Sequence, residues 1–222
     1  MSGSLKAPPT ISPSRARRDR ERAETRRLIL EAARELFTTE GYSQTSMRRI
    51  ADQIGYTATA IYHHFVDKDA LLNELCLNDF RMLGVALRQM GQLPDSESRL
   101  RAMGVNYVRF ALSHPQQFRF MFMVERPMPG PDTVHMNPAE DGYLFLISNV
   151  EEGLAKGAYR PEYTDAELVA QLFWAAVHGI ATIHLSKPDG GPHPWIQLRD
   201  SGETAEAMID VVLRGLLRNP TD

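Results

Sequence analysis

The sequence predicts an all-α protein with a small N-terminal domain of three helices and a larger helical domain after it. Apolar residues recur at intervals of three and four through most of the chain, the spacing of helices with one buried face. Glycine or proline follows most of these stretches, and no strand alternation or repeat of note is found. At 222 residues the chain is long enough for one large or two small domains with a buried core. We place the divisions at 1–22, 23–68 and 69–222.

The N-terminal segment, residues 1–22, is expected to be a flexible basic arm. Its first 14 residues contain three prolines and little to bury, and five arginines follow before residue 23. Two interpretations stay open for these arginines. They belong either to an arm that contacts DNA phosphates or an adjacent minor groove, or to the solvated start of the first helix.

The first helix of the N-terminal domain should end near Gly41, because its apolar face runs from Leu28 to Phe37. A second, short helix follows, with an apolar stripe of Met47, Ile50, Ala51 and Ile54. Thr45 or Ser46 can cap its start, and Gly55 can end it. The third helix is expected over 58–65, capped by Thr57. The expected core of this domain is Leu36, Phe37, Ile50, Ile54, Ile61 and Phe65.

The remaining helices are separated by proline and glycine. Asp67 can cap a long helix that runs without a breaker to Met90, and Lys68 is expected to face outward at the first turn of this helix. Five more helices are expected at residues 97–113, 116–124, 139–156, 165–186 and about 202–218. The proline-rich stretch 127–138 either covers a pocket or only joins two helices.

The net charge of −3 hides an uneven distribution. Residues 1–68 hold 12 Lys and Arg against 8 Asp and Glu, whereas residues 69–222 hold 13 against 20. The positive end therefore contains the second and third helices, which are joined at Gly55 and form a helix-turn-helix. This favours a nucleic-acid partner there. A single cysteine, Cys76, fits a reducing cytoplasm, and no apolar N-terminal run indicates a signal peptide. Polar residues interrupt the apolar stretch 168–185, so a core or interface helix is favoured over a membrane span.

Several ordered motifs resemble one family. Arg48-Arg49-Ile50-Ala51, Gly55-Tyr56-Thr57, Ala60-Ile61-Tyr62-His63-His64-Phe65 and Lys68-Asp69-Ala70-Leu71-Leu72 are similar, at fixed offsets, to the DNA-binding region of TetR-type transcriptional regulators. The DNA-binding candidates are Thr45, Ser46, Arg48, Thr57, Ala58, Thr59, Tyr62, His63 and Lys68.

The chemistry of these candidates agrees with the resemblance for most positions. The guanidinium of Arg48 matches the O6 and N7 acceptors of guanine, although a solvated surface arginine is the alternative. Thr57 and Thr59 offer hydroxyls or a methyl group, and Tyr62 and Lys68 suit phosphate oxygens. Relatives often carry an aromatic residue at the position of His63, so its role stays open.

The resemblance implies an effector cavity in the larger domain. The candidate ligand-binding residues are Tyr107, Phe110, Phe118, Phe122, Trp174 and His178. Met and aromatic walls adapt to varied apolar ligands, but helical spacing alone also makes these residues ordinary core. The stretch Trp174-Ala175-Ala176-Val177-His178-Gly179 resembles the Trp-x-x-x-His-Gly signature of one effector-domain subclass. His178 is then either a core histidine with satisfied hydrogen bonds or a polar anchor for a ligand.

The resemblance further implies a homodimer through the last two helices, whose small residues Ala175, Ala176 and Gly179 permit close approach. Two-fold symmetry then predicts a palindromic DNA operator. The expected function is a cytoplasmic, ligand-responsive repressor with DNA and a small, apolar effector as partners. No catalytic residue, cofactor, metal or membrane partner is expected. An enzyme and a dimerising scaffold are the alternatives, but we find no catalytic motif, and a scaffold leaves the helix-turn-helix unexplained.

Overall fold

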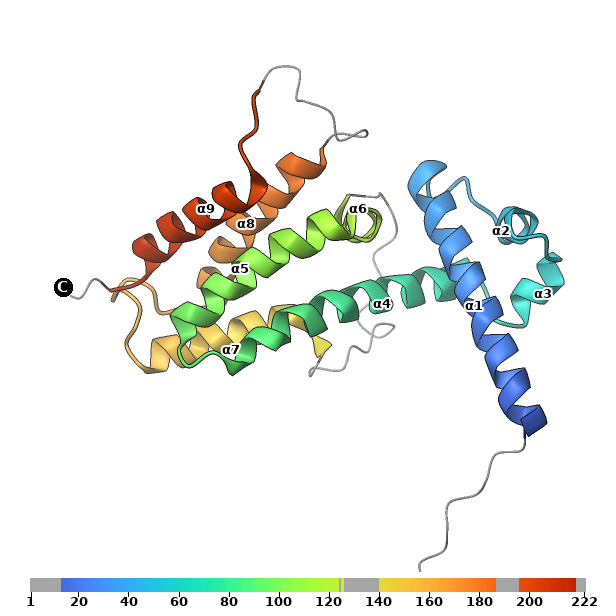
Figure 1. Ribbon diagram of the computed structural model, residues 1–222, viewed down its shortest axis with the longest axis horizontal. Helices are drawn as coiled ribbons and strands as arrows, with labels where there is room; N and C mark the ends of the chain where they lie inside the picture. The colour runs from blue at the N-terminus through green and yellow to red at the C-terminus, as the bar shows by residue number, and fades with distance from the viewer. Residues whose placement is uncertain (1–12, 124, 126–139, 187–195, 219–222) are drawn as a thin grey trace, which may run out of the picture. The chain divides into compact units, whose positions relative to one another are not determined.

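The computed structural model describes residues 13–123, 125, 140–186 and 196–218 (Figure 1). All the regular elements in this part of the chain are helices, apart from an isolated bridge between Tyr159 and Leu217, which confirms the predicted all-α class. The chain divides into two compact units, residues 1–72 and 73–222.

The first unit contains α1 (Pro13–Thr39), α2 (Met47–Gln53) and α3 (Ala58–Tyr62). α1 begins at Pro13, so residues 13–22 are helical and differ from the expected flexible arm; residues 1–12 lie outside the described residues. The expected core residues are buried, except that Ile54 is partly exposed. Gly55, with φ of 71°, adopts the left-handed conformation that the tight turn between α2 and α3 requires.

α3 is shorter than predicted, ending at Tyr62 rather than at Phe65. Its last turn closes because the carbonyl of Ile61 accepts from the amides of both His64 (2.8 Å) and Phe65 (3.0 Å). Arg26 of α1 then donates to the carbonyl of His64 at 2.6 Å, and its guanidinium lies 4.1 Å from the centre of the Phe65 ring. A side chain of α1 therefore stabilises the end of α3.

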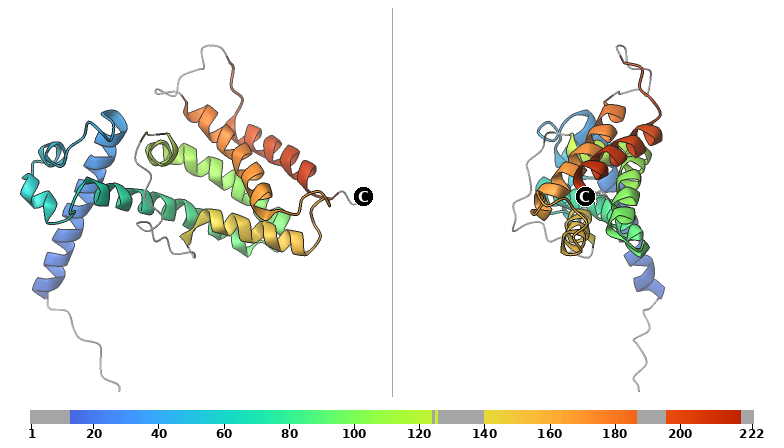
Figure 2. Two further views of the ribbon diagram at one scale, coloured as in Figure 1. Left: turned by 180° about the vertical axis from the view of Figure 1, so that it is seen from behind. Right: turned by 90° about the vertical axis from the view of Figure 1, so that its left-hand side faces the viewer.

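α4 (Lys68–Arg88) begins in the first unit and continues in the second, where a short 3-10 helix, Gln89–Gln92, follows it. The second unit also contains α5 (Ser96–Ser113), α6 (Pro115–Phe122), α7 (Gly142–Ala155), α8 (Ala166–Leu185) and α9 (Ser201–Leu216). α5, α8 and α9 pack against one another, as both views of Figure 2 show. By length and composition, α8 could cross a membrane. Its apolar side chains contribute to the core shared with α5 and α9, so its hydropathy is no evidence of a membrane span.

α4 and the start of α7 approach each other at two glycines. A Cβ atom on Gly84 would lie 1.8 Å from the carbonyl oxygen of Glu140, and a Cβ on Gly142 would lie 3.3 Å from the Cα of Gly84. Only glycine allows backbone to meet backbone this closely. An ion pair of 2.6 Å between Arg81 and Glu140 lies beside this contact.

A buried polar network joins α5 to α7. Arg99 donates to the Asn149 side chain at 2.5 Å, to the carbonyl of Leu93 at 2.9 Å and to Glu152 at 2.5 Å. Asn149 in turn donates to the carbonyl of Ser96 at 3.1 Å. These bonds satisfy a guanidinium that would otherwise be costly to bury.

Candidate nucleic-acid interface and ligand cavity

α3 presents its polar side chains to solvent. The hydroxyl of Thr57 caps the helix by accepting from the amide of Ala60 at 3.2 Å, and Ile61 turns inward with no exposed surface. Thr57 and Thr59 are exposed, and Tyr62 keeps 54% of its surface in solvent. Ala58 is half-buried at the leading end of the helix. α3 can therefore offer hydroxyl groups to a partner without disturbing its own core.

The two adjacent arginines of α2 differ in their contacts. Arg49 is engaged with the Glu40 carboxylate at 2.8 Å and with the Gln53 side chain at 3.0 Å. Arg48 is exposed, and within the described part of the chain no hydrogen bond or ion pair is found for its guanidinium. Arg48 is thus the arginine of α2 whose guanidinium can bind a base or a phosphate without breaking an existing bond.

Two of the predicted DNA-binding residues make hydrogen bonds within the fold. Thr45 is 2% exposed and donates to the carbonyl of Gly41 at 2.9 Å, so its hydroxyl is used inside the protein. The prediction that Lys68 faces outward was wrong: its ammonium donates to the carbonyls of Tyr42 (2.7 Å) and Thr45 (2.9 Å). Ser46 is exposed and caps α2 by accepting from the amide of Arg49 at 3.1 Å.

Tyr42 is a structural residue that the sequence analysis missed. Its ring lies 4.0 Å from the Lys68 ammonium and 5.3 Å from the Phe37 ring centre, and its hydroxyl donates to the Asp69 carboxylate. Burial, followed by this hydrogen bond, raises the pKa of Tyr42. The position of an aromatic residue directly after Gly41 could have indicated this structural role. Tyr42 and Lys68 together fix the turn between α1 and α2.

The adjacent histidines lie in different environments. His63 is exposed, and His64 is partly buried. Burial lowers the pKa of His64, and the charges of Arg22 and Arg26 and the neighbouring His63 lower it further. His64 is therefore held in its neutral form near α3, whereas His63 is accessible to a partner.

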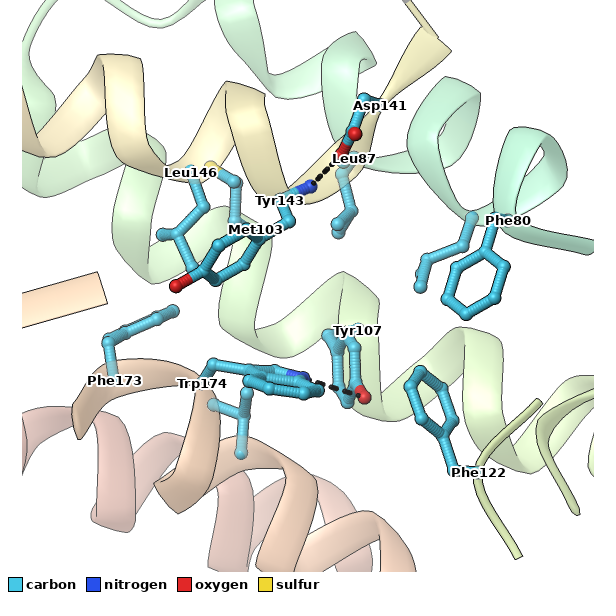
Figure 3. A pocket seen from close by; sticks show the side chains of 13 residues that line it. Phe80, Leu87, Met103, Tyr107, Phe122, Asp141, Tyr143, Leu146, Phe173 and Trp174 are labelled. Carbon is cyan, nitrogen blue, oxygen red and sulfur yellow. Dashed lines mark hydrogen bonds between the residues drawn. The ribbon is translucent and has the colours of Figure 1, made fainter. Parts of the chain in front are cut away.

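A cavity lies within the second unit, between α4, α5, α6, α7 and α8 (Figure 3). The cavity has a volume of about 90 Å³. Its walls are formed by Phe80, Leu83, Leu87, Met103, Tyr107, Phe122, Asp141, Gly142, Tyr143, Leu146, Phe173, Trp174 and Val177. Apolar and aromatic groups make up most of this surface, as in many small-molecule sites. Residues 127–138, which could have covered a pocket, lie outside the described residues.

Three of the six predicted ligand-binding residues line the cavity: Tyr107, Phe122 and Trp174. Phe118 and His178 lie outside its walls, and both pack against Tyr107, with ring centres 5.9 and 6.2 Å away. Phe110 is stacked on His114 at 4.6 Å instead. None of the six predicted residues lies on α4 or α7, because helical spacing identifies a buried face but not a gap in its packing.

A hydrogen-bonded chain of three side chains borders the cavity. Trp174 Nε1 donates to the hydroxyl of Tyr107 at 3.1 Å, and the same hydroxyl lies 2.8 Å from Nδ1 of His178. Burial raises the pKa of Tyr107 and lowers the pKa of His178. Both groups are therefore uncharged at neutral pH. Among the described residues, no group of three His, Cys, Asp or Glu side chains could hold a metal ion.

A helix-turn-helix with exposed polar groups, followed by a helical unit with an internal cavity, defines a helix-turn-helix regulator. Residues 29–75 match the model of the bacterial regulatory proteins of the tetR family, and residues 100–212, just over half of the chain, match that of the tetracyclin repressor-like C-terminal domain. The chain belongs to the TetR family of bacterial transcriptional regulators, which places it among DNA-binding proteins rather than enzymes.

Three similar proteins illustrate the match. The HTH-type transcriptional repressor Rv1474c of Mycobacterium tuberculosis is 46% identical over 68 residues, which cover 30% of this chain and 36% of that protein. The HTH-type transcriptional repressor KstR2 of Mycolicibacterium smegmatis is 26% identical over 227 residues, with 97% and 98% covered. The solved structure of the TetR family regulator PfmR from Thermus thermophilus is 26% identical, with a TM-score of 0.61 and 86% and 99% covered. The first match therefore spans only about a third of that relative.

Proposed function

We propose that this protein is a ligand-responsive, sequence-specific repressor that binds a palindromic operator as a homodimer and is released by a small, largely apolar effector. The direction of regulation follows the similar proteins Rv1474c and KstR2, which are described as repressors. The proposed location is the cytoplasm, where such a protein meets DNA. Neither a cofactor nor a metal is part of this proposal.

One observation carries the DNA-binding part of the proposal: the polar side chains of α3 are exposed while its apolar side chains form the core. We infer that α3 enters the major groove, with Thr57, Ala58, Thr59, Tyr62 and His63 at its surface. Arg48 supplies a free guanidinium for a guanine or a phosphate, and Ser46 lies at the start of the same helix, α2. Thr45 and Lys68 support this surface from beneath.

The dimer part rests on an apolar stripe along α8 and α9. On α8, Leu168, Leu172 and Ile183 are exposed, and Ala175 and Gly179 lie between them at helical spacing. On α9, Val211 is 68% exposed, and a Cβ atom on Gly215 would meet no atom within 4 Å. Because α8 and α9 pack side by side, their stripes together suit a second copy of the chain.

The cavity supports the effector part of the proposal. The helix-turn-helix units of a dimer can adopt an arrangement that fits DNA and one that does not. A ligand shifts the equilibrium between these two arrangements only by the difference in its affinity for them. α4 is suited to transmit such a shift, because it contributes Phe80, Leu83 and Leu87 to the cavity wall and starts in the helix-turn-helix unit.

The proposal can be tested by selecting binding sites for the full-length protein from a randomised duplex library. We expect an inverted repeat to be enriched, with one protein dimer bound per repeat. Affinity for that site should fall steeply with salt, because released counterions accompany each neutralised phosphate. Recovery of no preferred sequence, or of single half-sites bound by monomers, would reject the proposed operator recognition.

A further inference from the structure

We propose that the occupant of the cavity is an uncharged, mostly apolar molecule that presents one carbonyl oxygen to the hydroxyl of Tyr107, with His178 changing its tautomer to release that hydrogen. This inference deepens the proposed function, because it gives the chemical class of the effector. It is carried by the composition of the cavity wall and by the direction of its hydrogen bonds.

The wall disfavours charged ligands. Among the described residues that line the cavity, Asp141 is the one acidic side chain, and none is Lys, Arg or His. An anion would therefore enter a low-dielectric space with a carboxylate and no compensating cation. One oxygen of Asp141 already accepts from the amide of Tyr143 at 2.8 Å (Figure 3). The same oxygen accepts from the amide of Leu144 at 3.1 Å, so it serves as the cap of α7.

The donor is fixed by chemistry in only one of the two hydrogen bonds, the one between Trp174 and Tyr107. The indole of Trp174 can only donate, so the oxygen of Tyr107 must accept from it. The hydroxyl hydrogen of Tyr107 then has Nδ1 of His178 as its acceptor among the described residues, which requires His178 to carry its own hydrogen on Nε2. The lowered pKa of His178 supports this neutral imidazole.

A carbonyl group in the cavity can reverse the second bond. If the hydroxyl of Tyr107 donates to the ligand, its oxygen can stay bonded to His178 only when Nδ1 carries the hydrogen. Nδ1 then takes up a proton from water and Nε2 returns one to water, so the imidazole stays neutral. The oxygen of Tyr107 then accepts from both Trp174 and His178 while donating to the ligand. The indole of Trp174, the hydroxyl of Tyr107 and Nδ1 of His178 remain hydrogen-bonded in both states, so the ligand gains a bond while these three groups keep theirs.

Four probes of similar size and shape test this assignment. Acetophenone offers a carbonyl on an apolar frame, ethylbenzene offers the frame alone, and benzoate and benzylammonium carry a negative and a positive charge. Calorimetric titration of the full-length protein should give the highest affinity for acetophenone. Both charged probes should bind at least about ten times more weakly, because their charges must be desolvated.

The variant Tyr107→Phe should reduce the affinity for acetophenone relative to ethylbenzene by about five-fold, the usual effect of one lost hydrogen bond. Tyr159→Phe is the matched control, since it removes a buried tyrosine hydroxyl of the same unit that does not line the cavity and should leave that ratio unchanged. An equal effect of both variants would overturn the assignment. Tightest binding of benzylammonium would also overturn it, because Asp141 would then hold an organic cation.

A measurement on the unaltered protein avoids any dependence on the folding of a variant. The ¹⁵N chemical shifts of His178 should change from the Nε2–H to the Nδ1–H pattern when acetophenone is added, and should not change with ethylbenzene. The same pattern in both complexes would reject the proposed switch. These binding experiments contain no DNA, so their failure is distinguishable from a failure to bind an operator.

Discussion

The Lys68 ammonium lies 4.0 Å from the centre of the Tyr42 ring and donates to the carbonyl oxygen of Tyr42 at 2.7 Å. A third contact, to the carbonyl of Thr45, completes its surroundings. The start of α4 is thereby attached to the turn that leads into α2. A cation in this position orients the helix-turn-helix through bonds to its backbone.

Replacing Lys68 by Met should lower the free energy of unfolding by about 2 kcal/mol, because charged hydrogen bonds to two carbonyls are lost. Affinity for a preferred operator should fall more than affinity for random sequences, because the variant loosens the orientation of α3 without removing a phosphate contact. Chemical unfolding and fluorescence anisotropy would measure the two effects. Lys156→Met is the control, since Lys156 makes only an exposed pair with Glu152. If the Lys68 variant is stable and the slope of log affinity against log salt falls by the amount expected for one phosphate, Lys68 is instead a DNA contact.

Arg48 and Arg49 provide a paired test of base recognition. Arg48→Ala should cost about 1–3 kcal/mol of binding energy at a preferred operator and relax specificity there. Arg49→Ala should change stability by less than about 1 kcal/mol, because its pair with Glu40 is exposed, and should change sequence preference less. Titrations against the selected site and single-base variants would measure both. Equal loss of specificity in the two variants would contradict this distinction.

Leu172→Lys should separate the proposed dimer, because a charge would be placed within the apolar stripe of α8. Sedimentation velocity should show a monomer with unchanged helix content, and cooperative binding to the inverted repeat should be lost. Leu144→Lys is the matched control: Leu144 is also an exposed leucine, but it lies on α7. A dimer that survives Leu172→Lys would remove this stripe from the interface.

His178 should contribute a pH dependence to stability. Burial lowers its folded pKa, whereas the unfolded residue titrates near about 6.5. As the pH falls through this unfolded value, the unfolded chain binds the proton first, so stability is lost towards the folded pKa. Urea unfolding at pH 7.5 and 5.5 should show a larger loss for the native protein than for His178→Gln. Equal losses would mean that His178 is protonated as readily in the folded state.

The sequence predicted the helices and the helix-turn-helix because both depend on local spacing. The caps at Ser46 and Thr57, the turn at Gly55 and the inward position of Ile61 follow from residues within a few positions of one another. The contacts of Lys68 with Tyr42 and of Arg26 with His64 join residues 26 and 38 positions apart. No periodic pattern encodes such contacts, so an outward-facing Lys68 was the natural but incorrect prediction.

Only three of the six predicted ligand-binding residues line the cavity, for a related reason. Tyr107, Phe122 and Trp174 could be selected as aromatic residues on apolar faces, but Phe118 satisfies the same criterion and is fully buried behind the wall. Whether an apolar side chain faces a gap or fills it depends on helices from distant parts of the sequence. Phe80 and Leu146 belong to the wall for that reason.

The contact between Gly84 and Gly142 gives the cavity a stiff connection to α4. Side chains between two helices can usually rotate and absorb a small displacement, but the atoms nearest to Gly84 are main-chain atoms of Glu140 and Gly142. Asp141 and Gly142 also line the cavity. In the proposed regulator, ligands that displace the first turn of α7 by different amounts should therefore act differently on α4. We expect small differences in ligand length to separate inducers from antagonists.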